Sequence, residues 1–271
     1  MTLVQNIKFH LKIYFSYALQ NLKVKMSYPW DFFANMLGTV TYALLNVAFL
    51  WVILNKTTAI KGWTFPELVF LYGMGEFCFG LFAILFFHMV TRLSEHYIVE
   101  GYFDRLLVRP ISPLMQLIME NMDMFDLIIL IKGAVLIGWS WAYMPLDFNF
   151  INILSVLLAF VVGATVYLGI FLSITSISFW LPDRGGLLMP LFSLSDVSRY
   201  PLTIYPPGIR LFFSYVIPFG FAAFYPTVWV LKSGPEALFV LLESSAVAVV
   251  MLAIAIIIFR LGVNRYESTG T

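Results

Sequence analysis

The stretch INILSVLLAFVVGATVYLGIFLSITSISFW, residues 151–180, decides the fold because it contains no charged side chain from end to end. A helix needs about 20 consecutive apolar residues to cross the hydrocarbon core of a bilayer. Four other stretches meet this requirement, and they are residues 30–54, 67–91, 125–144 and 237–259. We therefore expect an all-α protein that crosses a membrane several times.

The composition of the chain agrees with a membrane protein. Of the 271 residues, 61% are hydrophobic and 11% are charged, against about 45–50% and about 25% in soluble domains. The 16 Lys and Arg residues balance the 15 Asp and Glu residues, and a net charge of +1 excludes binding of nucleic acid through charge. The single cysteine excludes an intrachain disulfide and a cysteine-based zinc cage.

Residues 1–28 differ from the spans because four lysines interrupt them. They contain no uninterrupted apolar core of the kind that a secretory signal peptide has. Lys8 and Lys12 fall on one helical face, whereas Leu11 and Phe15 fall on the other. This pattern predicts an amphipathic helix that lies in the membrane interface, and a solvated basic tail is the alternative.

The distribution of basic residues orients the chain, because cytoplasmic loops are enriched in Lys and Arg. Basic residues in the first 28 positions and after the last span place both termini in the cytoplasm. Arginines after the second span place the loop of residues 95–122 there as well. The arginines that indicate the cytoplasmic side after the second and the last spans are Arg92, Arg105, Arg109, Arg260 and Arg265.

Two cytoplasmic termini require an even number of crossings, so residues 185–231 contribute a single crossing. We expect a fifth span at residues 186–200, followed by a proline-broken segment at residues 201–231 that re-enters the outer leaflet. A crossing at residues 209–231 is the alternative. Either choice gives six spans.

The loop of residues 95–122 contains two short helical patterns. Phe103, Leu106 and Leu107 are spaced to form one apolar helical face. Ser112 followed by Pro113 is typical of a second helix start. The first helix could dock into a groove of a soluble partner or pack on its own bundle, and periodicity favours neither.

No motif for enzyme chemistry is present. The chain has no GxxxxGK[ST] loop and therefore no P-loop nucleotide site of its own, and it has no HExxH or GxSxG motif. Ionisable residues within the apolar stretches are more informative, because each is costly to insert into a membrane. Glu76 and Lys132 lie at similar depth in two antiparallel spans, where they could pair or remain separate. Asp196 and Arg199 are placed to satisfy each other.

The arrangement resembles the ABC-2 type exporter permeases over essentially the whole chain. Two patterns carry the resemblance: Gly101-Tyr-Phe-Asp-Arg-Leu-Leu-Val-Arg-Pro110 in the cytoplasmic loop, and Arg199-Tyr-Pro201-Leu-Thr-Ile-Tyr205 followed by Ile217-Pro218 and Tyr225-Pro226. The chain is most similar to a subgroup of six-span permeases of this length.

The resemblance implies a half-transporter in the cell membrane that is not itself an enzyme. Two copies, or two related chains, would form the pathway, and a heterodimer is favoured. Two separate ABC ATPase subunits would bind beneath and hold the ATP and Mg, so this chain would bind no cofactor or metal.

Three groups of residues have expected roles, and the resemblance implies the roles of the first and the third. The ATPase-coupling residues would be Gly101, Phe103, Asp104, Arg105, Leu106, Leu107, Arg109 and Pro110. The polar residues of the pathway or of the membrane interior, singled out above by their charge, would be Glu76, Lys132, Asp196 and Arg199. The re-entrant outer segment would be shaped by Pro201, Pro206, Pro218 and Pro226.

Three functions remain open at this level. The first is the permease of an ATP-driven exporter. The second is a secondary transporter driven by an ion gradient, with Glu76 and Lys132 as coupling residues, although the two halves of the chain show no convincing repeat. The third is a membrane-embedded enzyme acting on lipid, for which no convergent acids, histidines or metal ligands are visible.

Overall fold

The computed structural model describes residues 29–54, 59–144, 150–181, 186–231 and 235–268. Within these ranges the chain is helical and contains no strand, only an isolated bridge between Ile60 and Trp63. The predicted all-α class is therefore confirmed for the described part of the chain. The interfacial helix predicted for residues 1–28 lies outside it.

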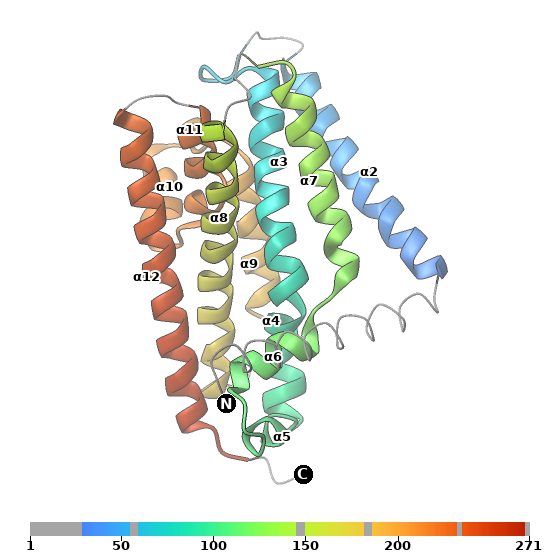
Figure 1. Cartoon of the computed structure of the whole chain (residues 1–271), viewed down its shortest axis with the longest axis vertical. Helices are drawn as coiled ribbons and strands as arrows, with labels where there is room; N and C mark the ends of the chain where they lie inside the picture. The colour runs from blue at the N-terminus through green and yellow to red at the C-terminus, as the bar shows by residue number, and fades with distance from the viewer. Residues whose placement is uncertain (1–28, 55–58, 145–149, 182–185, 232–234, 269–271) are drawn as a thin grey trace.

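Long helices form the bundle (Figure 1). They are α2 (Pro29–Leu54), α3 (Phe65–Phe82), α7 (Leu127–Trp141), α8 (Phe150–Ser176) and α12 (Pro235–Arg265). Of the described residues, four helical stretches are long and apolar enough to cross a membrane: 65–99, 124–141, 150–179 and 236–265. The apolar part of α2 is shorter, Met36–Val52. A total of six spans stays a prediction.

The second span extends beyond its predicted end at residue 91. Its helix continues from α3 through η1 (Ala83–Phe87), α4 (His88–Arg92) and η2 (Leu93–Val99), where η1 and η2 are π-helical. Other elements bind carbonyl groups at these irregular turns: Asp123 N donates to Ile84 O (3.1 Å), and Thr175 Oγ1 donates to Val90 O (2.9 Å). Such neighbours stabilise helix irregularities in a membrane, where no water replaces them.

Residues 186–231 form short helices instead of one long helix. α9 (Leu188–Ser195) and η5 (Asp196–Arg199) are too short to cross a membrane: α9 lies at about mid-height in Figure 1, and together they cover only about 20 Å, at a rise of about 1.5 Å per residue in α9 and about 2.0 Å in the 3-10 helix η5. The rest of the segment lies in the upper half. It consists of η6 (Leu202–Ile204), α10 (Pro207–Leu211), η7 (Phe212–Val216), η8 (Phe219–Ala222) and α11 (Phe224–Leu231).

The four prolines of this segment lie where helices begin or break. Pro201 and Pro206 precede η6 and α10, and Pro218 separates η7 from η8. Pro226 lies in the first turn of α11, where a missing backbone N–H is tolerated. The break that was expected at Pro226 therefore falls just before α11.

Helices α3 and α7 pack closely because glycines face the partner backbone. A β-carbon on Gly133 would lie 2.6 Å from the backbone nitrogen of Phe77, and one on Gly80 would lie 2.8 Å from that of Leu130. Small residues at helix interfaces are the usual means of close packing in membranes. This contact fixes the relative height of the side chains on α3 and α7.

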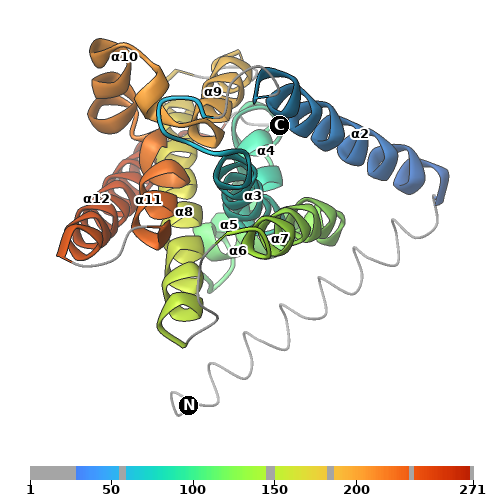
Figure 2. The same ribbon diagram turned by 90° about the horizontal axis from the view of Figure 1, so that it is seen from above.

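Helix α2 lies at the edge of the bundle. It contacts α3 and α7, and its lower end diverges from both (Figure 1, Figure 2). Ala43 and Leu50 are buried against the bundle, whereas Leu37, Leu44 and Phe49 are exposed. The divergence of α2 opens one side of the bundle at mid-height.

Candidate functional site

A buried ion cluster lies inside the bundle around Glu76 of α3. The Glu76 side chain is only 1% exposed. Lys132 of α7 places Nζ 2.6 Å from Glu76 Oε2, and Arg199 of η5 places Nη1 2.9 Å from Glu76 Oε1. The sequence left open whether Glu76 and Lys132 pair or remain separate, and in the structure they form an ion pair.

Arg199 also makes the contact with Asp196 that the sequence predicted, with Nη1 3.0 Å from Oδ1. Its guanidinium group lies 5.2 Å from the centre of the Phe79 ring, which is cation–π distance. Its Nε is buried and has no hydrogen-bond partner. The sequence analysis missed the contact between Arg199 and Glu76, although the high cost of a charge in an apolar segment predicts that each one has a partner.

A cavity of about 390 Å³ adjoins this cluster in the wedge between α2 and the bundle. Its bundle side carries three of the four charges and two apolar side chains: Glu76, Lys132, Arg199, Phe79 and Ile129. Its α2 side carries mainly small side chains: Ala34, Gly38, Thr39 and Tyr42. The cavity therefore has a charged wall and an uncharged wall.

The predicted coupling residues lie at the lower end of the bundle. Gly101 has φ of +79°, a left-handed conformation that favours glycine, and it turns the chain from η2 into α5 (Asp104–Leu107). Pro110 follows α5 and precedes α6 (Pro113–Asn121), which begins at the predicted Ser112–Pro113 start. The two short helices predicted for this loop are both present.

The apolar side chains of α5 and its flanking residues do not share one face, because some are buried in the bundle and others are exposed. Phe103 and Leu106 are fully buried within the chain, whereas Leu107 is 45% exposed and Val108 is 83% exposed. Phe103 packs against Phe179 and Tyr266, with ring centres 5.2 and 4.9 Å apart. Of the two alternatives left open for this helix, Phe103 and Leu106 pack on the bundle itself, and their role as coupling residues stays a prediction.

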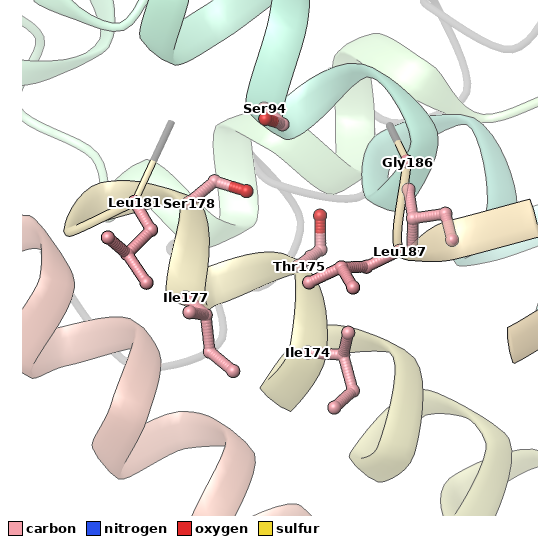
Figure 3. A pocket seen from close by; sticks show the side chains of 9 residues that line it. Ser94, Ile174, Thr175, Ile177, Ser178, Leu181, Gly186 and Leu187 are labelled. Carbon is pink, nitrogen blue, oxygen red and sulfur yellow. The ribbon is translucent and has the colours of Figure 1, made fainter. Parts of the chain in front are cut away.

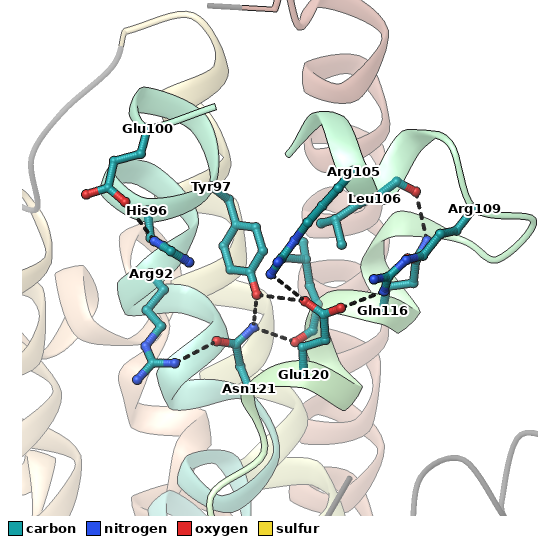
Figure 4. Close-up of polar contacts among 11 residues, drawn as sticks. Arg92, His96, Tyr97, Glu100, Arg105, Leu106, Arg109, Gln116, Glu120 and Asn121 are labelled. Carbon is teal, nitrogen blue, oxygen red and sulfur yellow. Dashed lines mark hydrogen bonds and ion pairs between the residues drawn. The ribbon is translucent and has the colours of Figure 1, made fainter. Parts of the chain in front are cut away.

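A network of polar side chains holds α5 against α6 (Figure 4). Glu120 binds Arg109 at 2.7 Å and Arg105 at 3.3 Å, and Tyr97 Oη donates to it at 3.3 Å. Gln116 Nε2 donates to the carbonyl oxygens of Leu106 (2.8 Å) and Ile111 (2.7 Å). The sequence analysis named Arg105 and Arg109 as coupling residues and missed Glu120 and Gln116.

The residues that follow α12 pack against this loop. Ser268 Oγ donates to Asp104 Oδ2 at 2.6 Å, next to the contact between Phe103 and Tyr266. Burial raises the pKa of the Tyr266 phenol to about 12, so this side chain stays uncharged at neutral pH. These contacts place the loop and the end of α12 at the same end of the bundle, as the charge distribution predicted.

A second cavity, of about 270 Å³, lies near the lower end between η2, the end of α8 and the start of α9 (Figure 3). Ser94, Thr175 and Ser178 are among its lining residues, and the others are apolar apart from Gly186. Thr175 uses its hydroxyl for the carbonyl of Val90. This cavity brings together no ionisable side chains from the described residues.

The long apolar helices are those of a multi-pass membrane protein. A family model described as ABC-2 family transporter protein matches residues 40–270, and the chain belongs to this family. It is thus a transport permease. The comparisons with curated proteins and with solved structures give no match.

Proposed function

We propose that this chain is the transmembrane subunit of an ATP-driven exporter in the cell membrane. It forms half of the substrate pathway beside a second permease, and a related partner chain is favoured over an identical one. Two separate ATPase subunits hold the ATP and Mg, and both termini of this chain are cytoplasmic. Membership of the ABC-2 family supports this proposal, because members typically work with ATPase partners.

The observation that carries the proposal is a rigid loop with an exposed apolar tip. Leu107 and Val108 project from a loop that Glu120, Gln116 and the end of α12 hold in place. An apolar anchor with a charged surround is the usual form of an interface centre. Arg105 and Arg109 supply the surround, and both are already oriented by Glu120.

The helix of residues 65–99 supports transmission of movement through the membrane. It connects Gly101, at the lower end, with Glu76 in the ion cluster without leaving the helical state. Its two π-helical segments lie between these points, and such segments often occur at functional sites. Movement of the loop by an ATPase would therefore reach the cluster along one helix.

The decisive experiment is co-purification with the ATPase in mild detergent after replacement of the tip. Leu107→Ala combined with Val108→Asp should leave the melting temperature of the permease unchanged and weaken ATPase binding by about 2 kcal/mol or more, as for an interface anchor. Tyr143→Ala, at an exposed position of the opposite end, is the matched control. Full ATPase retention by the double variant contradicts the proposal.

Transport driven by an ion gradient is the second candidate, and one observation favours it. Glu76 and Lys132 line a cavity at mid-height, as coupling residues of such a transporter would. Vesicles separate the two functions. Cargo movement that needs ATP and survives an uncoupler supports the exporter, whereas movement that stops with the uncoupler and ignores ATP supports ion coupling.

A further inference from the structure

A cavity of about 350 Å³ lies between the start of α6 and the lower part of α12, near the lower end of the bundle in Figure 1. Three of its lining residues are polar: Ser112, Arg260 and Asn264. The others are apolar, and they are Pro113, Leu114, Ile256, Phe259 and Val263. The cavity therefore joins an apolar groove to a group of polar side chains, and it shares no residue with the buried ion cluster.

Arg260 gives this cavity a positive charge that the described part of the chain does not balance. Among the described residues that line the cavity it is the one ionisable side chain, and it forms no ion pair with any residue that the structure describes. The Ser112 hydroxyl makes no capping bond to α6, and Asn264 lies one turn beyond Arg260 on α12. All three side chains can donate hydrogen bonds, so a ligand with one negative charge would suit them.

We propose that this cavity binds the anionic head group of a membrane phospholipid. The guanidinium group of Arg260 binds the phosphate through charge-assisted hydrogen bonds, and Ser112 and Asn264 donate to its remaining oxygens. The upper part of one acyl chain lies in the groove between Leu114 and Ile256. Binding requires no ATPase, so the site stands or falls separately from the proposed function.

The position of Arg260 favours a lipid over a dissolved anion. The apolar stretch of residues 237–259 ends directly before it, and no charged side chain lies between Glu243 and Arg260. At a rise of about 1.5 Å per residue this stretch is about 34 Å long, close to the thickness of about 30 Å of a hydrocarbon core. Arg260 therefore lies at the membrane surface, at the level of the lipid phosphates, and Ile256 and Phe259 lie at the level of the acyl chains.

The lipid connects two elements that otherwise pack on different neighbours. Helix α6 packs against α4 and η1, whereas α12 packs mainly against α8 and α11. Basic pockets between membrane helices are typical sites for anionic head groups. Because α6 follows α5 in the loop of residues 95–122, a bound lipid holds the second helix of this loop against the last span.

The test uses purified permease in nanodiscs, with no ATPase present. Phosphatidylglycerol and phosphatidylcholine probes carry the same photoactivatable group close to the glycerol, and mass spectrometry locates the crosslinks. We expect the phosphatidylglycerol probe to label residues 112–114 and 256–264 more strongly than the phosphatidylcholine probe does. Equal labelling overturns the proposal, because the site then selects no anion. Full competition by inorganic phosphate also overturns it, because a dissolved anion then occupies the site.

Two arginine variants distinguish a site from general attraction to an anionic bilayer. Arg260→Gln should lower phosphatidylglycerol labelling of the cavity about tenfold, the equivalent of one charge-assisted hydrogen bond. Arg265→Gln is the matched control, because Arg265 lies on the same helix and lines a separate cavity beside Tyr266. Both arginines are exposed, so the melting temperature should not change in either variant. An equal loss of labelling in the two variants contradicts the site, and so does wild-type labelling of Arg260→Gln.

A space-filling variant tests the groove without changing any charge. Ile256→Trp should abolish phosphatidylglycerol labelling, because the larger side chain occupies the space of the acyl chain. Ile257→Trp is the control, since Ile257 is 55% exposed and does not line the cavity. It should leave labelling unchanged. Wild-type labelling of Ile256→Trp, or equal losses in both tryptophan variants, overturns the assignment of the lipid to this groove.

Discussion

Arg199 crosses α3 at Gly75, and its Cγ lies 2.8 Å from the position that a β-carbon on this glycine would occupy. Any larger residue would push the Arg199 side chain away from α3. Glu76 is the neighbour of Gly75 in the sequence, and Phe79 lies one turn further along the same side of α3. The close contact between Arg199 and Gly75 therefore allows the guanidinium group to reach both partners. Glycine at position 75 is therefore needed for the ion cluster to form.

We predict that Gly75→Ala lowers the free energy of unfolding by about 1–3 kcal/mol, because the added methyl group overpacks the contact with Arg199. Gly38→Ala is the matched control in α2, since nothing lies within 4 Å of its β-carbon. It should be neutral or stabilising by up to about 1 kcal/mol through helix propensity. Thermal unfolding in detergent measures both variants, and equal effects would contradict the role of Gly75.

The pair of Glu76 and Lys132 should behave non-additively. Glu76→Gln alone leaves Lys132 without its partner, and Lys132→Met alone leaves Glu76 and Asp196 to share Arg199, so each single variant leaves one excess charge in the cluster, at a cost of up to about 3–5 kcal/mol. The double variant leaves Arg199 with Asp196, a balanced pair, and should be less destabilised than the sum of the two single variants. A double-mutant cycle on the free energy of unfolding decides this, and additive losses would remove the pair as an energetic unit.

Glu120 should control the order of the α5 loop without controlling the fold. Glu120→Gln keeps the shape of the side chain and removes its charge, so Arg105 and Arg109 lose their ion-pair partner. Hydrogen exchange of the amides of residues 104–109 should become about tenfold faster. Glu267→Gln, at an exposed position of the same end, is the control. Unchanged hydrogen exchange in this segment would mean that its apolar contacts alone hold the loop in place.

The predicted topology places both termini in the cytoplasm. Cysteines introduced at Lys8 and at Glu267, in a Cys78→Ala background, should resist membrane-impermeant thiol reagents in intact cells. A cysteine introduced at Tyr143, an exposed position at the opposite end, should react and thereby show that the reagent is active. Labelling of Lys8→Cys or Glu267→Cys from outside would contradict the six-span topology.

Local patterns in the sequence predicted the features that depend on neighbouring residues. Long apolar runs correspond to α3, α8 and α12, and Ser112–Pro113 marks the start of α6. The spacing of Asp196 and Arg199 predicted their ion pair. Residues that are close together in the sequence determine each of these features, so the sequence alone is sufficient to predict them.

Features that depend on distant residues were not predicted. Periodicity could not decide where Phe103 packs, because its partners, Phe179 and Tyr266, are far away in the sequence. The contact between Arg199 and Glu76 depends on the missing side chain of Gly75, which no periodicity reveals. The π-helical turn at Ile84, and Val90 in α4 between the two π-helical segments, likewise receive hydrogen bonds from Asp123 and Thr175, which are distant in the sequence.

The bond between Asp104 and Ser268 joins residues 164 positions apart, and it has a consequence for biogenesis. During synthesis the α5 loop leaves the ribosome long before α12 has been made and inserted. The loop can bury Phe103 against Tyr266 only after α12 has reached its place. A partner that recognises the finished loop would thus bind complete permeases and pass over those whose insertion is still under way.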